Sequence, residues 1–326
     1  MSAAAPSVRP PRGGFATVRR NTVDRIGDPS LRALAGLASA VAVAVILLLA
    51  YKVFDGSGSA FSRFGLGFVT AKVWNPVTNQ FGAASFVYGT LITSAIAMLF
   101  AAPLSIAIAL YLTELAPRRI RRPVATLIDL LAAIPSVIVG LWGILVMVPF
   151  MVNQIEPALH SVLGWIPLFG GSPSPLGLLP AAAVLTIMTV PIVSAITREV
   201  FETVPGDLKE AAYALGATRW EMTRMVILPI ARPGIVGATI LGLGRALGEA
   251  IAVTMVIGGA VAIKASLFQP GDTLASRIAS QFQNASGTVY ISSLFYLAAI
   301  LLVISLIVNI GARLLVRRGV PAQVMN

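Results

Sequence analysis

Residues 85–112 read SFVYGTLITSAIAMLFAAPLSIAIALYL, a stretch without a single charged side chain. About 20 apolar residues in helical form are enough to cross the roughly 30 Å hydrocarbon core of a bilayer. Continuous apolar runs of this length also exclude a membrane β-barrel, whose strands alternate in polarity and hold only about ten residues each. The stretch therefore predicts a transmembrane helix.

Five further stretches of the same kind recur along the chain. Apolar residues make up 57% of the sequence and charged residues 11%, well below the roughly one quarter that is usual in soluble domains. We therefore expect an all-α, polytopic membrane protein. Its six predicted transmembrane helices cover about 33–54, 85–112, 123–151, 176–198, 232–263 and 290–316.

The net charge of +11 follows the predicted topology. Most Lys and Arg residues lie in the N-terminal arm, in the second and fourth connections and in the C-terminal tail, and few lie on the other side of the membrane. This asymmetry is the positive-inside bias, so both termini are predicted on the cytoplasmic side of a bacterial plasma (inner) membrane. Basic residues distributed in this way indicate contact with membrane lipid, and we do not expect the protein to bind nucleic acid.

The predicted organisation begins with a basic cytoplasmic arm at 1–32, expected to be disordered and held at the anionic inner leaflet. The first transmembrane helix at 33–54 and an extracytoplasmic connection of turns and short loops at 55–84 follow. A five-helix core spans 85–316, and 317–326 form a cytoplasmic tail. The chain has no cysteine, and its single histidine, His160, has no ligand cluster beside it, so no disulfide and no metal site are predicted.

The connection between the fourth and fifth predicted helices is long and polar: TREVFETVPGDLKEAAYALGATRWEMTRMVILPIARPG, residues 197–234. It is patterned as two short helices at about 205–228, separated by Gly216, which permits a left-handed turn. Thr218 and Glu221 have the spacing of a capping box at the start of the second helix. Such a pair cannot bury a core of its own, so we expect it to dock on another protein; a simple surface turn is the alternative.

This connection resembles the EAA signature of binding-protein-dependent ABC importer permeases. The signature reads E-A-A, three residues, G, nine residues, I, one residue, L-P, and here Val226 stands in place of the isoleucine. The resemblance implies a MetI-like permease fold in which the two short helices are coupling helices that insert into a groove of an ATPase subunit. The residues expected to couple to the ATPase are Glu210, Ala211, Ala212, Gly216, Leu228 and Pro229.

Three further segments resemble the phosphate-importer permeases, of the PstC subunit type. They are WNPVTNQFGAASFVYGTL (74–91), TELAPRRIRRPVATLIDLLAAIPSVIVGLWGI (113–144) and LGRALGEAIAVTMVIGG (241–259), and the resemblance covers about 64–316. It implies the permease subunit of an ATP-driven importer that moves inorganic phosphate into the cytoplasm. The implied partners are a second permease subunit of the PstA type, two ATPase subunits and an extracytoplasmic phosphate-binding protein.

The chain itself is not expected to be an enzyme. It has no GxxxxGK[ST] phosphate loop, so ATP and Mg are expected on the partner ATPase, and no cofactor is expected here. Two other functions stay open: a permease for another oxyanion such as sulfate or molybdate, and an ion-coupled secondary transporter whose cytoplasmic helix pair is only a gate.

Arg245 and Glu249 lie inside the fifth predicted helix, where a charge costs roughly 2.5–3.5 kcal/mol on insertion scales. Residues four apart share a helix face, so the two side chains can pair. Guanidinium offers a planar fork of donors that matches phosphate oxygens. The resemblance implies that Arg245 meets the travelling anion while Glu249 balances its charge; a structural ion pair that fixes helix packing is the alternative.

Three hydroxyl residues are weaker candidates for lining the pathway. Thr90 and Ser94 share a face of the second predicted helix, although hydroxyls in helices commonly bond to their own backbone. Ser136 follows Pro135 at an expected kink, where freed backbone groups need partners.

Overall fold

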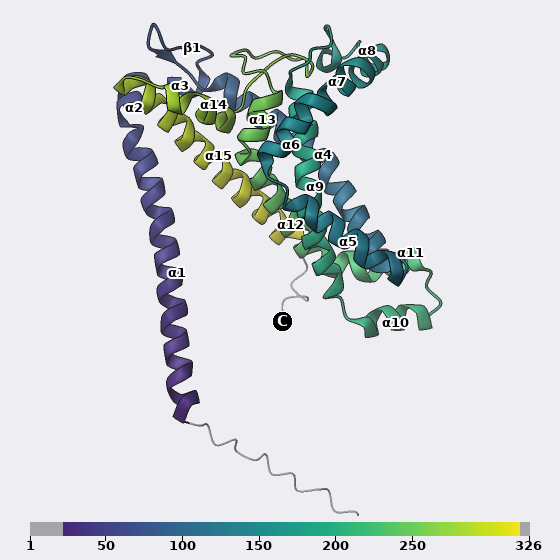
Figure 1. The fold of residues 1–326 in the computed structure, drawn as a ribbon. Helices are drawn as coiled ribbons and strands as arrows, with labels where there is room; N and C mark the ends of the chain where they lie inside the picture. Colours follow the sequence, from purple (N-terminus) through teal and green to yellow (C-terminus); the bar gives the residue numbers. More distant parts are fainter. Residues whose placement is uncertain (1–21, 320–326) are drawn as a thin grey trace, which may run out of the picture. The chain divides into compact units, whose positions relative to one another are not determined.

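The computed structural model describes residues 22–319, which belong to two compact units, residues 1–51 and 52–326 (Figure 1). Residues 1–21 of the expected basic arm and 320–326 of the expected tail lie outside the described residues. Helix α1 (Thr22–Gly56) begins within the expected arm. Its membrane-crossing part, Ser30–Gly56, is long and apolar, and its hydrophobic window buries no side chain within this chain.

Five further helical segments of the second unit are long and apolar enough to cross a membrane, which confirms the six predicted helices for the described residues. Helices form here because a backbone in hydrocarbon must satisfy every N–H and C=O internally. All five segments are continuous, with neither coil nor an extended residue between their bounds. Four of them are Ala84–Leu115, Leu178–Glu202, Arg219–Gly248 and Thr288–Leu314.

The helical elements within these segments are regular α-helix with short π-helical turns. Prolines inside them, such as Pro103 and Pro191, remove backbone donors without ending the helix. The elements are α4 (Ala84–Leu110), η1 (Tyr111–Leu115), α9 (Leu178–Glu202), α11 (Arg219–Met222), η5 (Thr223–Ile227), α12 (Leu228–Gly248) and α15 (Thr288–Gly319).

The third predicted helix, 123–151, differs from the structure. The chain forms one amphipathic helix, α5 (Arg118–Ala132), stops at Pro135, and begins again to give the crossing segment Ser136–Leu163. Pro135 has an extended backbone and precedes the first residue of the new helix, a position where proline costs no hydrogen bond. The elements of this second part are α6 (Ser136–Trp142), η2 (Gly143–Met147), α7 (Val148–Phe150), η3 (Met151–Ile155) and α8 (Glu156–Leu163).

One end of the second unit carries the connections that were expected outside the membrane (Figure 1). Where turns and short loops were predicted at 55–84, the chain forms two short helices and a two-stranded hairpin, in which Trp74 pairs with Phe81. Their side chains form an aromatic cluster with Phe86 and Tyr290. The elements at this end are α2 (Gly58–Phe64), α3 (Gly67–Thr70), β1 (Trp74–Asn75), β2 (Gln80–Phe81), η4 (Pro167–Phe169), α13 (Ile251–Val256), α14 (Leu274–Gln281) and η6 (Phe282–Asn284).

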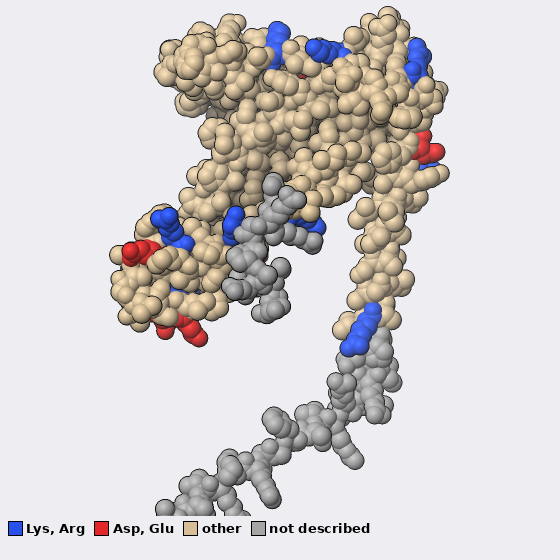
Figure 2. All heavy atoms as spheres, turned by 180° about the vertical axis from the view of Figure 1, so that it is seen from behind, with Lys and Arg blue, Asp and Glu red and all other residues tan. Residues whose placement is uncertain are grey.

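The opposite end carries α10 (Gly206–Ala214) and α11, where the two short helices were predicted (Figure 1). Gly216 has φ +82° and makes the left-handed turn between them, and Thr218 and Glu221 form the expected capping box. The second helix is not separate, however, because α11 runs through η5 into α12 as one segment. Figure 2 shows charged side chains gathered towards the two ends of this face, with mostly uncharged surface between them.

Candidate functional site

The fifth membrane helix breaks at Glu249. Helix α12 ends at Gly248, Glu249 has an extended backbone (φ −69°, ψ 121°), and α13 starts at Ile251. The sequence predicted one helix over 232–263, so the break is a difference between expectation and structure. It creates a helix C-terminus and a helix N-terminus side by side, where a cation and an anion respectively are stabilised by the exposed backbone groups.

Arg245 and Glu249 occupy these two helix ends. Arg245 lies in the last turn of α12, and the Glu249 Oε1 accepts a long hydrogen bond of 3.4 Å from the backbone N–H of Ala252 in α13. The guanidinium Nη2 lies 3.9 Å from Glu249 Oε2, the long limit of an ion pair. The two side chains therefore do meet as predicted, but across the end of a helix rather than along one continuous face.

The ion pair with Glu249 occupies only part of the hydrogen-bonding capacity of Arg245. Within residues 22–319, the guanidinium makes this one ion pair and no hydrogen bond, and its side chain is 39% exposed while that of Glu249 is 9% exposed. A guanidinium has five N–H donors. Most of its donors are therefore available to a further oxygen-bearing group.

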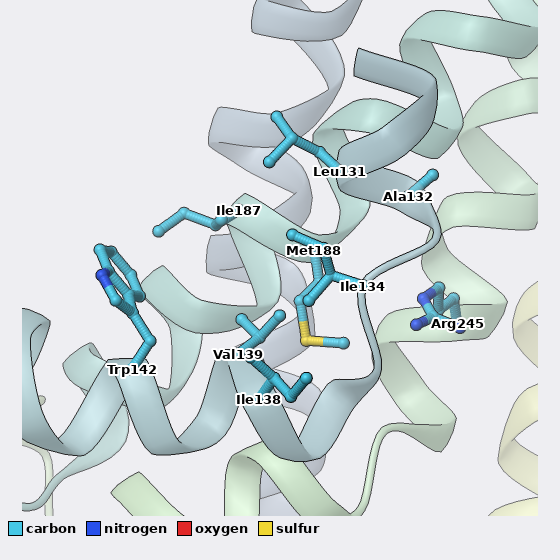
Figure 3. Close-up of a pocket in the computed structure, with 9 residues that line it drawn as sticks. All are labelled: Leu131, Ala132, Ile134, Ile138, Val139, Trp142, Ile187, Met188 and Arg245. Atoms are coloured by element: carbon cyan, nitrogen blue, oxygen red, sulfur yellow. The ribbon is translucent and has the colours of Figure 1, made fainter. Parts of the chain in front are cut away.

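These donors face a cavity of about 300 Å³. In Figure 3, Arg245 lies on one side of this cavity and apolar side chains from α5, α6 and α9 lie on the other. Among the lining residues, Arg245 is the only charged one. The apolar lining consists of Leu131, Ala132, Ile134, Ile138, Val139, Trp142, Ile187 and Met188.

The cavity lies at the break before α6. Its lining comes from both sides of this break, from α5 and from α6, together with α9 and Arg245 of α12. Sequence reasoning placed a kink at Pro135 but did not find the cavity or its apolar lining. An apolar wall around a single cation lowers the local dielectric constant and strengthens any contact with an anion.

Small residues of α12 fall into two groups. A Cβ added at Gly242 would lie 2.4 Å from Val193 Cγ2 and 2.9 Å from Thr189 Cγ2, so α12 and α9 are in close contact there. A Cβ at Gly244 or Gly248 would meet nothing within 4 Å. Gly242 is thus required by helix packing one turn before Arg245, and the other two glycines border open space.

The three hydroxyl candidates are not among the residues that line this cavity. Thr90 is buried; its Oγ1 donates to the Phe86 carbonyl and accepts from the Leu274 N–H at 2.9 Å, so it ties α4 to α14. Ser94 is also buried and donates to the Thr90 carbonyl. Ser136 is half-buried at the start of α6. In this structure the site consists of Arg245, Glu249 and apolar side chains.

Helices α10 and α11 present an apolar surface. A hollow of about 490 Å³ lies between α10 and α11, lined by residues that include Leu208, Ala211 and Met225. Leu215 is 90% exposed beside it, and Trp220 is 64% exposed. Of the residues expected to couple to an ATPase, Glu210, Ala211 and Gly216 are exposed, Ala212 and Leu228 are half-buried, and Pro229 is exposed at the start of α12.

Three ion pairs were not foreseen from the sequence. Lys209 of α10 binds Glu114 of η1 at 2.7 Å. Arg198 binds Asp129 at 3.3 Å and joins α9 to α5. The third joins Asp272 to Arg277. The two members of each pair are far apart in sequence or lie in a connection, so no periodic sequence pattern predicts these contacts.

Asp272 and Arg277 form a buried pair in the connection before α15. Arg277 Nε lies 2.7 Å from Asp272 Oδ2, and the guanidinium also donates to the Gly259 carbonyl and lies over the Phe86 ring. Burial raises the pKa of the Asp272 carboxyl above its ordinary value, and the charge of Arg277 opposes this shift. The pair fixes α14 against the outer end of α4.

No group of three or more His, Asp or Glu side chains in the described part of the chain could hold a metal ion. His160 contacts only the Phe169 carbonyl and an aromatic ring.

Six described segments able to cross a membrane, a helix break beside Arg245 and a pair of short helices at one end give the architecture of a multi-pass membrane permease. Residues 101–319 match the family described as binding-protein-dependent transport system inner membrane component. The chain is 47% identical over 323 residues to the phosphate transport system permease protein PstC of Mesorhizobium japonicum, covering 97% of this chain and 96% of that protein. It is 47% identical to PstC of Pasteurella multocida over 85% of this chain and 88% of that protein.

Solved structures agree on the fold. A chain of a bacterial alginate ABC transporter, solved with its alginate-bound periplasmic protein, aligns with a TM-score of 0.59 at 19% identity, covering 91% of this chain and 97% of that one. A chain of the MetNI methionine ABC transporter aligns with a TM-score of 0.53 at 20% identity, covering 72% and 94%. The chain belongs to the binding-protein-dependent transport permeases, in the family of PstC proteins.

Membership of this family has direct consequences. The chain is a multi-pass inner membrane protein and the permease subunit of an ABC importer. It is a transport component rather than an enzyme, because the ATPase of such importers is a separate subunit, and an extracytoplasmic binding protein delivers the substrate.

Proposed function

We propose that this chain is the permease subunit of an importer that moves inorganic phosphate into the cytoplasm, and that Arg245 contacts the phosphate on its way. The observation that supports this most directly is the half-exposed guanidinium of Arg245, held only loosely by Glu249 at 3.9 Å and facing an otherwise apolar cavity. The names of the curated PstC relatives support phosphate as the anion.

The role of Glu249 follows from its distance to Arg245. Its carboxylate compensates the guanidinium when the pathway is empty, which lowers the cost of a buried charge. A contact of 3.9 Å is loose enough for an incoming anion to compete for the same donors. Weak, shared contacts allow the anion to leave again, which transport requires.

The proposed complex contains a second permease subunit of the PstA type, two ATPase subunits and an extracytoplasmic phosphate-binding protein. The exposed apolar hollow between α10 and α11 supports an ATPase contact through Glu210, Ala211, Ala212, Gly216, Leu228 and Pro229. ATP and Mg would bind the ATPase, and this chain would need no cofactor. Both termini are cytoplasmic in this proposal, in keeping with the positive-inside bias.

The substrate is tested by uptake into proteoliposomes that contain the complete complex, with ATP inside the compartment that the ATPase faces. Labelled phosphate should accumulate only with ATP and the binding protein, and unlabelled sulfate or molybdate in excess should not compete. Competition by sulfate or molybdate at phosphate-like concentrations would instead assign another oxyanion. Accumulation without any ATPase would point to an ion-coupled transporter and contradict the proposal.

A further inference from the structure

Helix α10 is held to the rest of the protein by very few side chains. Of its residues, only Lys209 and Ala212 are partly shielded from solvent, and the others are exposed. These two are three residues apart, so they lie on one face of the helix. Ala212 packs against the apolar cluster that contains Phe201 and Met222. One small methyl group and one charged side chain therefore make the contact on this face.

The charged contact is the stronger of the two. Lys209 Nζ donates to Glu114 Oε1 at 2.7 Å, and the two side chains are only 21% and 15% exposed. A charge-assisted hydrogen bond of this length, partly withdrawn from solvent, is stronger and less screened than a surface pair. It joins α10 to η1, the last turn of the membrane segment that begins with α4.

Glu114 is part of a rigid helix end. Leu112 is 2% exposed and Thr113 is buried beside it. The Thr113 hydroxyl donates to the Ala109 carbonyl, and Arg121 of α5 donates to the Thr113 carbonyl. A force applied to Glu114 therefore acts on the whole end of α4 rather than on a loose side chain.

Helix α4 in turn reaches the site of Arg245. It packs along both α9 and α12. The Met98 Cε of α4 lies 3.6 Å from the point where a Cβ on Gly242 would stand, and Gly242 is one turn before Arg245. Packed interiors transmit displacement because they hold few voids. A shift of α4 thus changes the wall against which the end of α12 rests.

We propose that the Lys209–Glu114 ion pair is the link that passes movement of α10, driven by the ATPase, to α4 and from there to the Arg245 site. Lys209 and Glu114 are positioning residues in this mechanism, since they act through α4 and touch no substrate. The inference rests on the proposed function, because it requires a partner ATPase that moves α10.

A second cytoplasmic pair offers a matched control. Asp129 and Arg198 lie 3.3 Å apart and join α5 to α9 without involving α10. Removing this pair costs one ion pair at the same end of the protein, in which Asp129 is 49% exposed. It therefore measures the general effect of losing such a contact, separately from any effect on coupling.

The experiment uses the complete complex in proteoliposomes, with ATP hydrolysis and phosphate uptake measured on the same preparation. The variants are Glu114→Gln, Lys209→Met, the charge exchange Lys209→Glu with Glu114→Lys, and the control Asp129→Asn. Phosphate transported per ATP hydrolysed should fall about five-fold or more in both single variants, which is the low end of typical coupling between two sites. The charge exchange should restore most of the lost ratio of phosphate to ATP. The control Asp129→Asn should keep the ratio of the unmodified complex.

Three results would overturn this inference. The single variants could keep the normal ratio of phosphate to ATP, the charge exchange could fail to restore it, or Asp129→Asn could lower it equally. Failure of Glu114→Gln and of the charge exchange to assemble would also overturn it, because the pair would then serve assembly. Failure of the proposed function is distinct, since the unmodified complex itself would then show no ATP-driven phosphate uptake.

Discussion

Replacing Arg245 by Gln tests the central contact of the transport site. Gln keeps a shorter polar side chain and removes the charge and most of the donors. At an effective dielectric constant of about 20, unit charges about 4 Å apart interact by roughly 4 kcal/mol. The guanidinium is 39% exposed, so solvent screening reduces this figure. We take about 1.5–3 kcal/mol, the usual contribution of a hydrogen bond to a charged group.

Since about 1.4 kcal/mol corresponds to a factor of ten, we expect phosphate uptake to fall roughly 10- to 100-fold in Arg245→Gln. The assay is initial uptake rate in proteoliposomes, with ATPase activity and subunit stoichiometry measured in parallel. Arg245→Lys keeps a point charge without the planar fork of donors. Its rate of phosphate uptake should therefore lie between those of the unmodified complex and Arg245→Gln. The double variant Arg245→Gln with Glu249→Gln should be no slower than Arg245→Gln alone, because both residues act as one unit.

Normal uptake by an assembled, ATP-hydrolysing Arg245→Gln complex would refute the reasoning. Loss of assembly in Arg245→Gln, together with an Arg245→Lys complex that assembles and transports normally, would also refute it, because the pair would then be structural. Lys retains the ability to pair with Glu249, so a purely structural role predicts a nearly normal Arg245→Lys complex.

Three further predictions concern the packing of α12, the buried ion pair of Asp272 and Arg277, and the apolar surface at α10 and α11. Gly242→Val should destabilise the protein by about 1–3 kcal/mol or more because its side chain overlaps α9, whereas Gly244→Ala, with open space around its Cβ, should leave the melting temperature in detergent nearly unchanged. Arg277→Gln should cost about 3–5 kcal/mol by leaving the Asp272 carboxylate buried and unpaired. Because burial raises the pKa of Asp272, the carboxyl takes up a proton as the pH falls, so this loss should be smaller in melts at acidic pH than at pH above neutral. Leu215→Glu, at a 90% exposed position, should change stability by less than about 0.5 kcal/mol yet abolish copurification with the ATPase; retained copurification would contradict the docking role of this surface.

The sequence by itself determined the class of the protein and its local chemistry. Six apolar stretches predicted the six crossing helices, because a helix in hydrocarbon satisfies its own backbone and needs no distant partner. The turn at Gly216 and the capping box of Thr218 and Glu221 were predicted for the same reason, since their hydrogen bonds join residues at most a few positions apart.

Only the tertiary structure decided where the charges meet. Hydropathy predicted one crossing helix at 123–151, kinked at Pro135, and one continuous helix at 232–263. In the structure both are broken, at Pro135 and at Glu249, and the cavity beside Arg245 lies next to these breaks. Lys209 and Glu114 are 95 positions apart, and the local sequence around either residue does not predict their contact. Coulomb energy depends on distance in space, and that distance is set by the packing of whole helices.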